Sequence, residues 1–355
     1  MADSNQAATD TPRRPLLEAR ELTRVFRVGG LRSRKHLHAV DEANFVINPG
    51  EIVALVGESG SGKSTIARLL AQVYAPSSGE ILFEGTPLSS LKSRQDVLAY
   101  RAAVPMVFQD PFSSLNPAFT VAHGIMRGFK LHRHDISAAD REAEAERVLN
   151  AVGLSPASQV FGRYPYELSG GQRQRIGFAQ ALAYQPKVIL ADEPVSMLDI
   201  SIRIGLLNVM TSLRDDQGVS LLYITHDIAS ARYVADRMMV MYAGRIVESG
   251  PVEDVLGNPL HPYTQLLVAA VPDPRAELAV TAEMAKGEPP KVIDPGPGCR
   301  FVDRCPLARE VCRTTTPPLL ELKPGIRAAC HVAADDHGRG AESTGGAELG
   351  AKVAA

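Results

Sequence analysis

Short apolar runs alternate with helical patterns along most of the first 250 residues. Residues 16–26 and 38–47 alternate between apolar and polar positions, as half-buried strands do. Mainly apolar runs of strand length follow, and they cover residues 52–56, 104–108, 187–193, 220–225 and 238–242. Between these runs, apolar residues recur at helical spacing, most clearly at Ile202, Leu206, Val209 and Leu213. Strands that alternate with helices predict a largely parallel sheet covered on both faces.

Some stretches depart from this alternation. Short hairpins are expected over residues 79–88 and around Ala243 and Gly244. Residues 121–152 show helical periodicity with charged faces, after a Pro- and Ser-rich loop at 111–120, which predicts a helical insertion. The sequence therefore predicts a disordered start at 1–15 and a core at 16–255, with a helical insertion at about 111–180. An extension at 256–335 and a disordered tail at 336–355 are expected to follow.

Composition narrows the class of protein. The formal net charge is −2 and the pI is about 6.5, so no global basic field points to nucleic acid as a partner. No apolar run is long enough to span a bilayer, and the first residues lack a hydrophobic signal region, so we expect a cytosolic chain. All four cysteines lie after residue 298, and in a cytosolic protein such clustering favours metal binding over disulfides.

The strongest motif spans residues 57–65, GESGSGKST, between an apolar strand and an amphipathic helix. Gly57, Gly62, Lys63 and Ser64 match the G-x-x-x-x-G-K-[ST] spacing of a phosphate-binding loop. Glycines bring backbone N–H groups close to phosphate oxygens, Lys63 adds a mobile cation, and the hydroxyl of Ser64 suits Mg²⁺. The helix is expected to bury Ile66, Leu69, Leu70 and Val73 on one face. The alternative is a purely structural turn, and the motif favours ATP with Mg²⁺.

Polar residues follow three other apolar strands. Asp192 and Glu193 end the strand at 187–193, His226 follows 220–225, and Gln109 follows 104–108. In a parallel sheet these ends lie beside the phosphate loop, so Asp192 is expected to hold Mg²⁺ and Glu193 to orient or deprotonate the attacking water. The alternatives are a helix cap for the acidic pair and a structural role for the histidine.

The motif LSGGQ at 168–172 opens a second helix. Ser169, Gly170 and Gly171 supply a helix N-terminus with a free hydroxyl, which suits an anion. The chain thus has two helix starts that attract phosphate but one lysine-bearing loop. Head-to-tail pairing of two chains, with ATP between the loop of one and the LSGGQ of the other, explains both. A serine cap with glycines for a tight turn is the simpler alternative.

With these motifs in place, residues 16–255 resemble the ATP-binding cassette family of transporter ATPases. The resemblance implies a P-loop NTPase (RecA-like) α/β core with a mixed sheet, an antiparallel β subdomain and a helical insertion. It implies that Lys63, Ser64 and Thr65 bind phosphates and Mg²⁺, that Glu193 is the catalytic base, and that His226 contacts the γ-phosphate. The full nucleotide and Mg²⁺ set it implies is Phe26, Gly57, Ser59, Gly60, Ser61, Gly62, Lys63, Ser64, Thr65, Gln109, Ser169, Gly170, Gly171, Gln172, Asp192, Asp199 and His226.

Individual positions carry particular roles or departures. Phe26 is the candidate for stacking on adenine, with an ordinary core position as the alternative. Gln109 is implied to link the Mg²⁺ site, shared with Ser64 and Asp192, to the membrane partner. Met197 stands in SMLD where the family usually has alanine, but Asp199 and Glu193 are present, so we expect an active hydrolytic site.

The segment after 255 resembles a particular branch of that family. NPLHPYTQLLVAAVPDP at 258–274 is similar to the extension of dipeptide and oligopeptide importer ATPases. The resemblance implies a peripheral protein on the cytoplasmic face of the inner membrane. Its implied partners are two permease subunits, a second ATPase, either a paralogous chain or a second copy, and a solute-binding protein that acts through the permease. Oligosaccharide or nickel is the alternative solute.

The four cysteines are spaced C-x5-C-x6-C-x17-C at Cys299, Cys305, Cys312 and Cys330. This spacing fits neither the usual zinc pairs nor ferredoxin. The segment is similar to importer-ATPase tails that bind a 4Fe-4S cluster, and zinc, free thiols or disulfides are the alternatives.

Two other functional classes fit less well. A soluble cassette protein of DNA repair or translation would show long heptads, a second cassette or excess basic residues. A small-molecule kinase shares the phosphate loop, but it leaves LSGGQ and the ITHD around His226 without a purpose.

Overall fold

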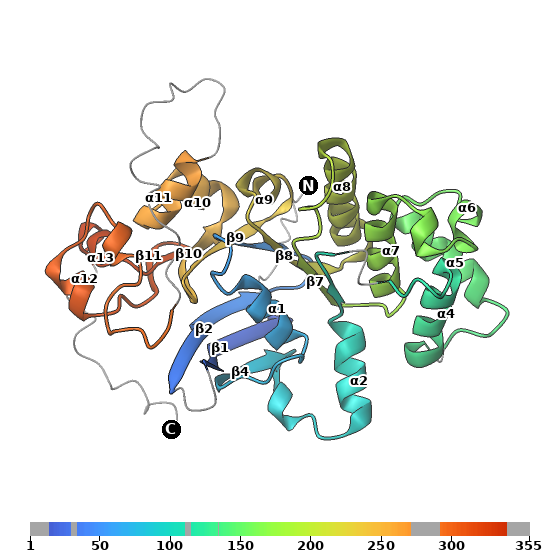
Figure 1. The fold of residues 1–355 in the computed structure, drawn as a ribbon, viewed down its shortest axis with the longest axis horizontal. Coiled ribbons are helices and arrows are strands. Elements are labelled where there is room, and N and C mark those ends of the chain that lie inside the picture. Colours follow the sequence, from blue (N-terminus) through green and yellow to red (C-terminus); the bar gives the residue numbers. More distant parts are fainter. Residues whose placement is uncertain (1–13, 30–33, 111–114, 134, 271–291, 339–355) are drawn as a thin grey trace, which may run out of the picture.

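The computed structural model describes residues 14–29, 34–110, 115–133, 135–270 and 292–338. Its centre is an eight-stranded mixed sheet in the order β11-β12-β10-β9-β3-β8-β7-β6 (Figure 1). The strands from β9 to β6 run parallel, and β10, β12 and β11 continue the sheet antiparallel. The bounds are β3 Ile52–Val56, β6 Met106–Val107, β7 Val188–Asp192, β8 Ser220–Thr225, β9 Arg237–Tyr242, β10 Arg245–Pro251, β11 Leu320–Lys323 and β12 Ile326–Ala328.

A second, antiparallel sheet has the order β2-β1-β4-β5. Its strands are β1 Leu17–Val28, β2 Lys35–Ile47, β4 Ser78–Phe83 and β5 Thr86–Pro87. The last two form the hairpin expected at 79–88, and β9 and β10 form the hairpin expected around Ala243 and Gly244. The alternation predicted for the first strand is seen at its start, where Leu17 and Ala19 are buried and Glu18 and Arg20 are more exposed.

Alternate residues of β3 enter two separate cores. Ile52, Ala54 and Val56 belong to the core beneath the helices, and Val53 and Leu55 belong to the core shared with the antiparallel sheet. The second core contains α1 Lys63–Leu70 and Tyr100 of α2 Arg94–Ala103. The first core is covered by α7 Gly170–Leu182, α8 Ile200–Gln217, α9 Ile228–Val234, α10 Val252–Gly257 and α11 Pro262–Ala269. Coverage of both faces, as predicted, buries every residue of β3.

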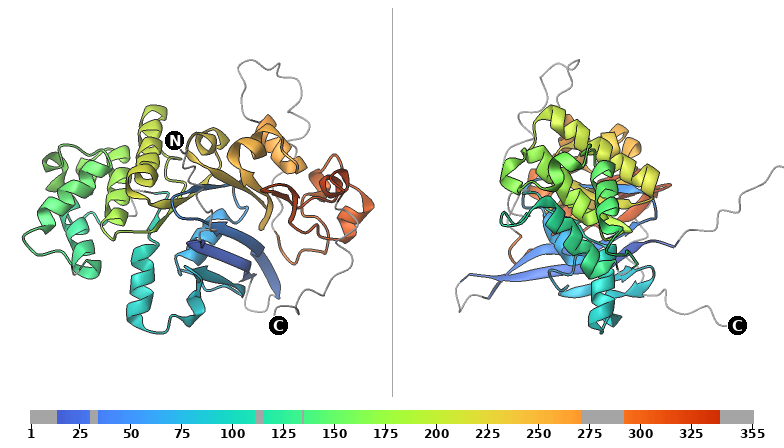
Figure 2. Two further views of the ribbon diagram at one scale, coloured as in Figure 1. Left: turned by 180° about the vertical axis from the view of Figure 1, so that it is seen from behind. Right: turned by 90° about the vertical axis from the view of Figure 1, so that its right-hand side faces the viewer.

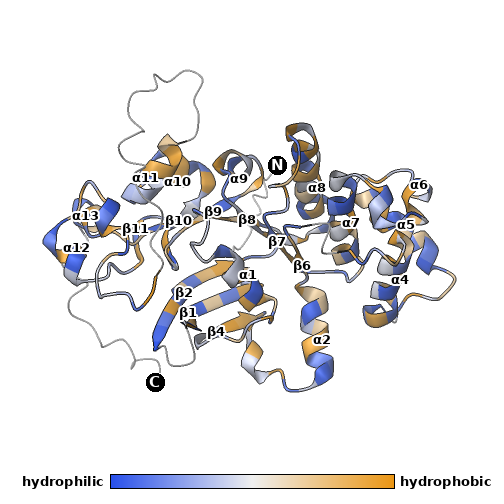
Figure 3. Ribbon diagram, in the orientation of Figure 1, coloured by the Kyte–Doolittle hydropathy of each residue, from blue (hydrophilic) through white to orange (hydrophobic). Residues whose placement is uncertain are grey.

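The helical insertion contains α4 Val121–His132, α5 Arg141–Ala151 and α6 Ser158–Phe161. Its apolar stripe, which includes Ile125 and Leu149, is buried, and polar and apolar faces alternate around α4 and α5 in Figure 3. Insertion and C-terminal extension lie at opposite ends of the molecule (Figure 2). Within the described ranges, no helix combines the length and apolarity needed to cross a membrane.

Several local predictions were wrong or incomplete. Val73 was expected on the buried face of the first helix, but α1 ends at Leu70, Gln72 turns the chain with a φ of +54°, and Val73 is 58% exposed. The strand expected at 104–108 is reduced to β6, because α2 extends to Ala103 before it. The sequence reasoning missed α2, whose N-cap Ser93 accepts the Asp96 N–H.

The C-terminal extension also holds elements that were not anticipated, β11, β12, α12 Glu310–Thr314 and α13 His331–Asp336. Disorder was predicted for 1–15 and 336–355, and residues 1–13 and 339–355 lie outside the described part of the chain, as do 111–114 of the predicted loop.

One buried histidine begins the helix α11. His261 is 1% exposed; its side-chain Nδ1 accepts the Tyr263 N–H at 3.0 Å, and its backbone N–H donates to the Glu248 carboxylate at 2.9 Å. Burial lowers the pKa of His261 to about 3. Burial raises the pKa of the neighbouring Glu248, the only carboxylate among its hydrogen-bond partners in the described residues.

His261 should therefore make the folded protein less stable as the pH is lowered. Between an ordinary pKa of about 6.5 and the folded pKa of about 3, the unfolded chain binds a proton that the folded chain refuses. From pH 7.5 to 5.5 the free energy of unfolding should fall by about 1.4 kcal/mol more in the wild type than in His261→Asn, which keeps a cap acceptor. Glu248 is common to both proteins and cancels. Urea unfolding at both pH values measures the difference, and equal losses would contradict a buried neutral imidazole.

Candidate nucleotide site

The loop from Gly57 to Gly62 is pressed against backbone on two sides. Gly57 has a φ of +155°, and a Cβ there would lie 2.2 Å from the carbonyl oxygen of Met241 in β9. Gly62 has a φ of +110°, and a Cβ would lie 2.1 Å from the carbonyl oxygen of Ala39 in β2. Both positions therefore require glycine. The loop ends at α1, and the start of such a helix, with unpaired N–H groups and the positive end of the dipole, suits a phosphate.

Lys63 and Ser64 meet the acidic strand end at this loop. Lys63 is 4% exposed, and its ammonium donates to the carbonyl oxygens of Gly57 and Glu58 at 2.7 and 2.8 Å. Burial lowers its pKa, and the carboxylates of Glu193, Asp192 and Glu58 oppose that shift. The Ser64 hydroxyl donates to Asp192 Oδ1 at 2.9 Å, and burial raises the pKa of Asp192. These oxygens are the hard ligands that Mg²⁺ prefers.

A second group gathers around Glu193. Gln109 Nε2 donates to Glu193 Oε2 at 3.0 Å, and His226 Nδ1 lies 3.5 Å from the same oxygen. Glu193 has a φ of +47°, and its N–H donates to the Ile224 carbonyl at 2.9 Å, which ties the acid to the end of β8. The ends of β6, β7 and β8 thus bring together the three polar residues that the sequence placed there.

The LSGGQ turn lies at the surface, with its serine exposed. Ser169 is the N-cap of α7; its Oγ accepts the Gln172 N–H at 3.2 Å, and the Gln172 side chain accepts the Ser169 N–H at 3.0 Å. A Cβ on Gly171 would lie 2.3 Å from Ile202 of α8, so this glycine allows the two helices to pack closely. Asp199 precedes α8 and is exposed.

Phe26 lies in β1, half-buried, opposite Leu37 of β2. Its ring meets Tyr74 edge-on at 5.3 Å, and the Arg24 guanidinium lies 4.5 Å from its centre. Adenine stacking by Phe26 stays a prediction.

All four cysteines are free thiols, with Cys312 and Cys330 buried. Burial, with smaller contributions from the charges of the other three cysteines, raises the pKa of Cys299 to about 11, so the four lie near one another. As the side chains are placed, no three His, Cys, Asp or Glu residues in the described ranges form a metal-binding group. The geometry therefore gives the predicted iron–sulfur centre no support.

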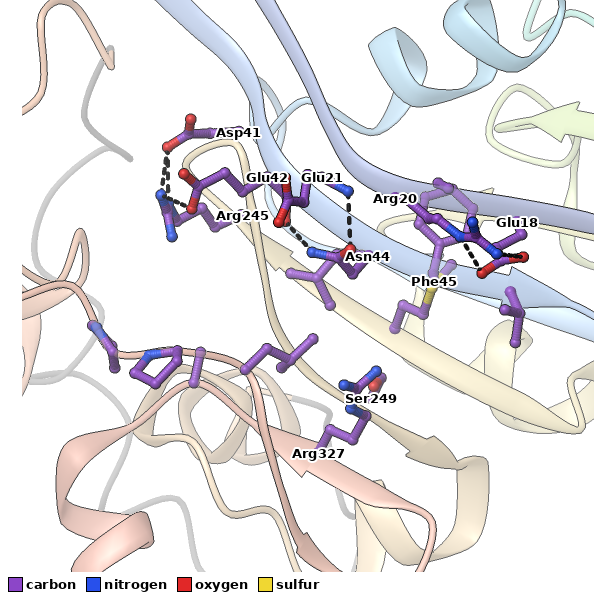
Figure 4. Close-up of a pocket in the computed structure, with 18 of the residues that line it drawn as sticks. Glu18, Arg20, Glu21, Asp41, Glu42, Asn44, Phe45, Arg245, Ser249 and Arg327 are labelled. Carbon is purple, nitrogen blue, oxygen red and sulfur yellow. Dashed lines mark hydrogen bonds and ion pairs between the residues drawn. The ribbon is translucent and has the colours of Figure 1, made fainter. Parts of the chain in front are cut away.

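A cleft with a volume of about 550 Å³ opens between the two sheets, away from the predicted site (Figure 4). None of the predicted site residues lines it. Many of its charges neutralise one another, as where Arg245 pairs with Asp41 and Glu42, each at 2.9 Å. The cleft offers no evident catalytic group.

The sequence reasoning missed two residues that contact the phosphate loop. Tyr263 accepts the N–H of Glu58 at 2.9 Å, and Arg304 binds the Glu58 carboxylate at 3.0 and 3.1 Å. Tyr263 stands in the HPYT segment used for the resemblance, but no local pattern links either residue to a loop more than 200 positions away.

Comparison with known proteins agrees with the site. Residues 40–196 match the family model for ABC transporters, and residues 247–312 match the model for the C-terminal region of oligopeptide/dipeptide transporters. The chain is 44% identical to a probable peptide ABC transporter ATP-binding protein, y4tS, of Sinorhizobium fredii, over 84% of this chain and 83% of that protein. It is 41% identical to the oligopeptide transport ATP-binding protein AppF of Bacillus subtilis, over 89% and 97% of the two chains.

Solved structures place the fold in the same family. The ATP-binding cassette MJ0796, solved as a post-hydrolysis dimer with ADP and Pi, matches with a TM-score of 0.59 and 26% identity, over 66% of this chain and 98% of that one. CbiO1 of Clostridium perfringens, part of an ABC transporter complex, gives the same TM-score and identity over 69% and 92%. The chain therefore belongs to the ATP-hydrolysing ATP-binding cassette family of transporters, and it carries the C-terminal region of the oligopeptide/dipeptide branch.

Proposed function

We propose that this chain hydrolyses ATP to drive the uptake of dipeptides or oligopeptides through a separate permease. The observation that carries the proposal is the meeting of Lys63 and Asp192 with Glu193, Gln109 and His226 at one edge of the sheet. The peptide as solute is supported by the names of the relatives and by the C-terminal family match. Oligosaccharide and nickel remain the alternative solutes.

The residues around the loop divide the chemistry. Lys63, Ser64 and Thr65 bind the phosphates, and Ser64, Asp192 and Gln109 would supply oxygens to a bound Mg²⁺, which would neutralise phosphate charge. Glu193 takes a proton from the water that attacks the γ-phosphorus, and ADP leaves with the bridging oxygen. His226 holds the γ-phosphate, and its contact with Glu193 keeps that carboxylate in place.

The second half of the site belongs to another subunit in this proposal. Ser169, Gly170, Gly171, Gln172 and Asp199 act on the nucleotide held by a second ATPase, either a copy of this chain or a paralogue. The exposure of Ser169 and Asp199 supports this role, because a capping serine buried in its own fold could not reach a partner. The exposed N-terminus of α7 adds a positive dipole end toward that nucleotide.

A groove between the sheet edge and the helical insertion is the proposed permease site. Two adjoining hollows share Gln180 and Tyr184; one reaches Phe119 of the insertion and the other reaches Phe108, next to Gln109. Phe108 and Phe119 are 46% and 41% exposed, which suits an apolar element of a partner. The ATPase would then be peripheral, on the cytoplasmic face of the inner membrane, with the solute-binding protein acting through the permease.

We also propose that the four cysteines bind a metal centre, with a 4Fe-4S cluster ahead of zinc. The proposal rests on the clustering of the four cysteines in the sequence and on backbone hydrogen bonds to Cys299, Cys305 and Cys330 from residues just after each, and not on a metal-binding group already formed among the described residues. The side chains would have to turn toward one another to coordinate a metal.

The division of the chain into a cassette at 16–255 and an extension at 256–335 stays a prediction.

Replacing the proposed base should separate binding from turnover. Glu193→Gln keeps the shape and the Gln109 contact but cannot accept a proton, so ATP hydrolysis should fall by about a hundredfold or more. ATP should still bind, and a nucleotide-trapped dimer should accumulate in size-exclusion chromatography. Glu253→Gln is the matched control, since Glu253 is an exposed acid paired with Arg232. Unchanged hydrolysis in Glu193→Gln would remove Glu193 from this role.

A charge in the groove should uncouple transport. Phe119→Asp places an uncompensated carboxylate at the proposed permease contact, so peptide-dependent ATPase stimulation in reconstituted vesicles should be lost while basal hydrolysis persists. Leu131→Asp is the control, because Leu131 lies in α4, the helix that follows Phe119, is outside the groove and is 56% exposed. Equal stimulation in the two variants would argue against the groove.

The metal proposal has a direct chemical test. Protein purified without oxygen should be brown and contain iron and acid-labile sulfide, and Cys305→Ser should reduce both. A colourless protein with stoichiometric zinc would replace the cluster by zinc, and a metal-free protein would reject the centre altogether.

A further inference from the structure

The turn from Cys299 to Cys305, in the C-terminal extension, lies directly against the phosphate loop. Arg304 at its end donates through Nη1 and Nη2 to the two carboxylate oxygens of Glu58, at 3.0 and 3.1 Å. The side chains of Arg304 and Glu58 are 11% and 24% exposed, so water weakens this two-pronged pair less than it would on the surface. The guanidinium also lies 5.7 Å from the ring centre of Tyr242 in β9.

A second contact fixes the backbone of the same residue. The Glu58 N–H donates to the hydroxyl oxygen of Tyr263 at 2.9 Å, and Tyr263 is fully buried. The ring of Tyr263 packs against Tyr242 and Phe301, with centroids 4.6 and 5.6 Å away. Helix α11, strand β9 and the cysteine turn therefore meet in one aromatic cluster beneath Glu58.

Arg300 secures the far end of the loop through its neighbours. One of its Nη atoms donates to the carbonyl oxygen of Ala243, and the other donates to Asp41 of β2. The next residue, Gly244, donates its N–H to the Ser61 carbonyl at 2.8 Å. Arg300 is mostly buried, with 9% of its side chain exposed, so its position is well defined.

We propose that Arg304 and Tyr263, helped by Arg300, are positioning residues that hold the phosphate loop in its phosphate-binding shape. This inference rests on the proposed nucleotide site. The Lys63 ammonium donates to the carbonyl oxygens of Gly57 and Glu58, so fixing Glu58 on both its backbone and its side chain also fixes the cation that meets the phosphates. The loop has positive φ at Gly57, Gly60 and Gly62, and a glycine-rich segment that is ordered in advance loses less entropy when it binds.

Coupling of this kind works in both directions. If the extension favours the binding shape of the loop, nucleotide must favour the docked extension by the same factor. ATP should therefore slow the hydrogen exchange of backbone amides at 300–305 in the wild type, although none of these residues belongs to the proposed ATP contacts. The Arg304→Gln variant should lose most of that slowing.

The experiment compares ATP affinity and turnover in Arg304→Gln, Glu58→Gln and the double variant. Each single change should raise the Kd for ATP by about tenfold, since it removes a charge-assisted pair, with kcat at saturating ATP unchanged. The double variant should be no weaker than either single one, because both remove the same contact. Arg304→Lys should restore part of the affinity. The matched control is Arg309→Gln, in the same extension, where an exposed arginine pairs with Asp335 at 2.8 Å.

Two further variants make the result decisive. Tyr263→Phe leaves the aromatic cluster intact and removes one acceptor, so it should raise Kd by a smaller factor, and it serves if Arg304→Gln fails to fold. Lys63→Ala tests the nucleotide site itself, and wild-type affinity there would overturn the proposed function. Loss of binding in Lys63→Ala together with unchanged Kd in Arg304→Gln and Tyr263→Phe would overturn only the positioning role. An equal loss in Arg309→Gln would also overturn it.

Discussion

A buried ammonium group is the constraint on which the nucleotide site depends. Lys63 is almost fully covered, and a charge taken out of water is tolerated only when acceptors replace the lost hydration. The carbonyl oxygens of Gly57 and Glu58 supply that replacement, and they can do so because the loop folds back over the lysine. The positive φ values of the glycines, the close approach of β2 and β9 and the position of the cation are therefore parts of one solution.

The two acids at the end of β7 differ in surroundings, and the difference suits two kinds of chemistry. Asp192 is buried and receives the Ser64 hydroxyl, an arrangement that holds a metal-binding oxygen in a fixed direction. Glu193 follows the strand with a positive φ and lies between Gln109 and His226; its side chain is 16% exposed and that of His226 is 59% exposed. A residue that must take a proton from water needs an open side of this kind. Neighbouring positions on one strand thus serve binding and proton transfer separately.

Much of the fold could be predicted because local patterns of apolar and polar residues determine it. The apolar runs became strands, Ile202, Leu206, Val209 and Leu213 line the inner side of α8, and the polar residues after three strands meet where parallel topology requires. What escaped prediction depends on distant partners. Arg304 looks like one more charge in a basic stretch, and only the fold brings it to Glu58, 246 positions away. The strands β11 and β12 are short, and they become strands because β12 pairs with the edge strand β10 and β11 pairs in turn with β12. The prediction for Val73 was wrong for a local reason, because α1 ends at Leu70 although the helical pattern of apolar residues continues to Val73.

The surface beside the LSGGQ turn bears on how the site is completed. Met197, Ile200 and Ile204 are 60%, 76% and 49% exposed, and they lie at the start of α8, which packs against α7. A Cβ on Gly170 would touch Leu198, so this apolar rim continues to the exposed Ser169. Large apolar side chains gathered around a polar anion-attracting turn are typical of a face that another protein covers. Met197, the departure from the family pattern, is part of this exposed surface. Methionine in place of the usual alanine therefore adds apolar area beside the exposed Ser169 turn.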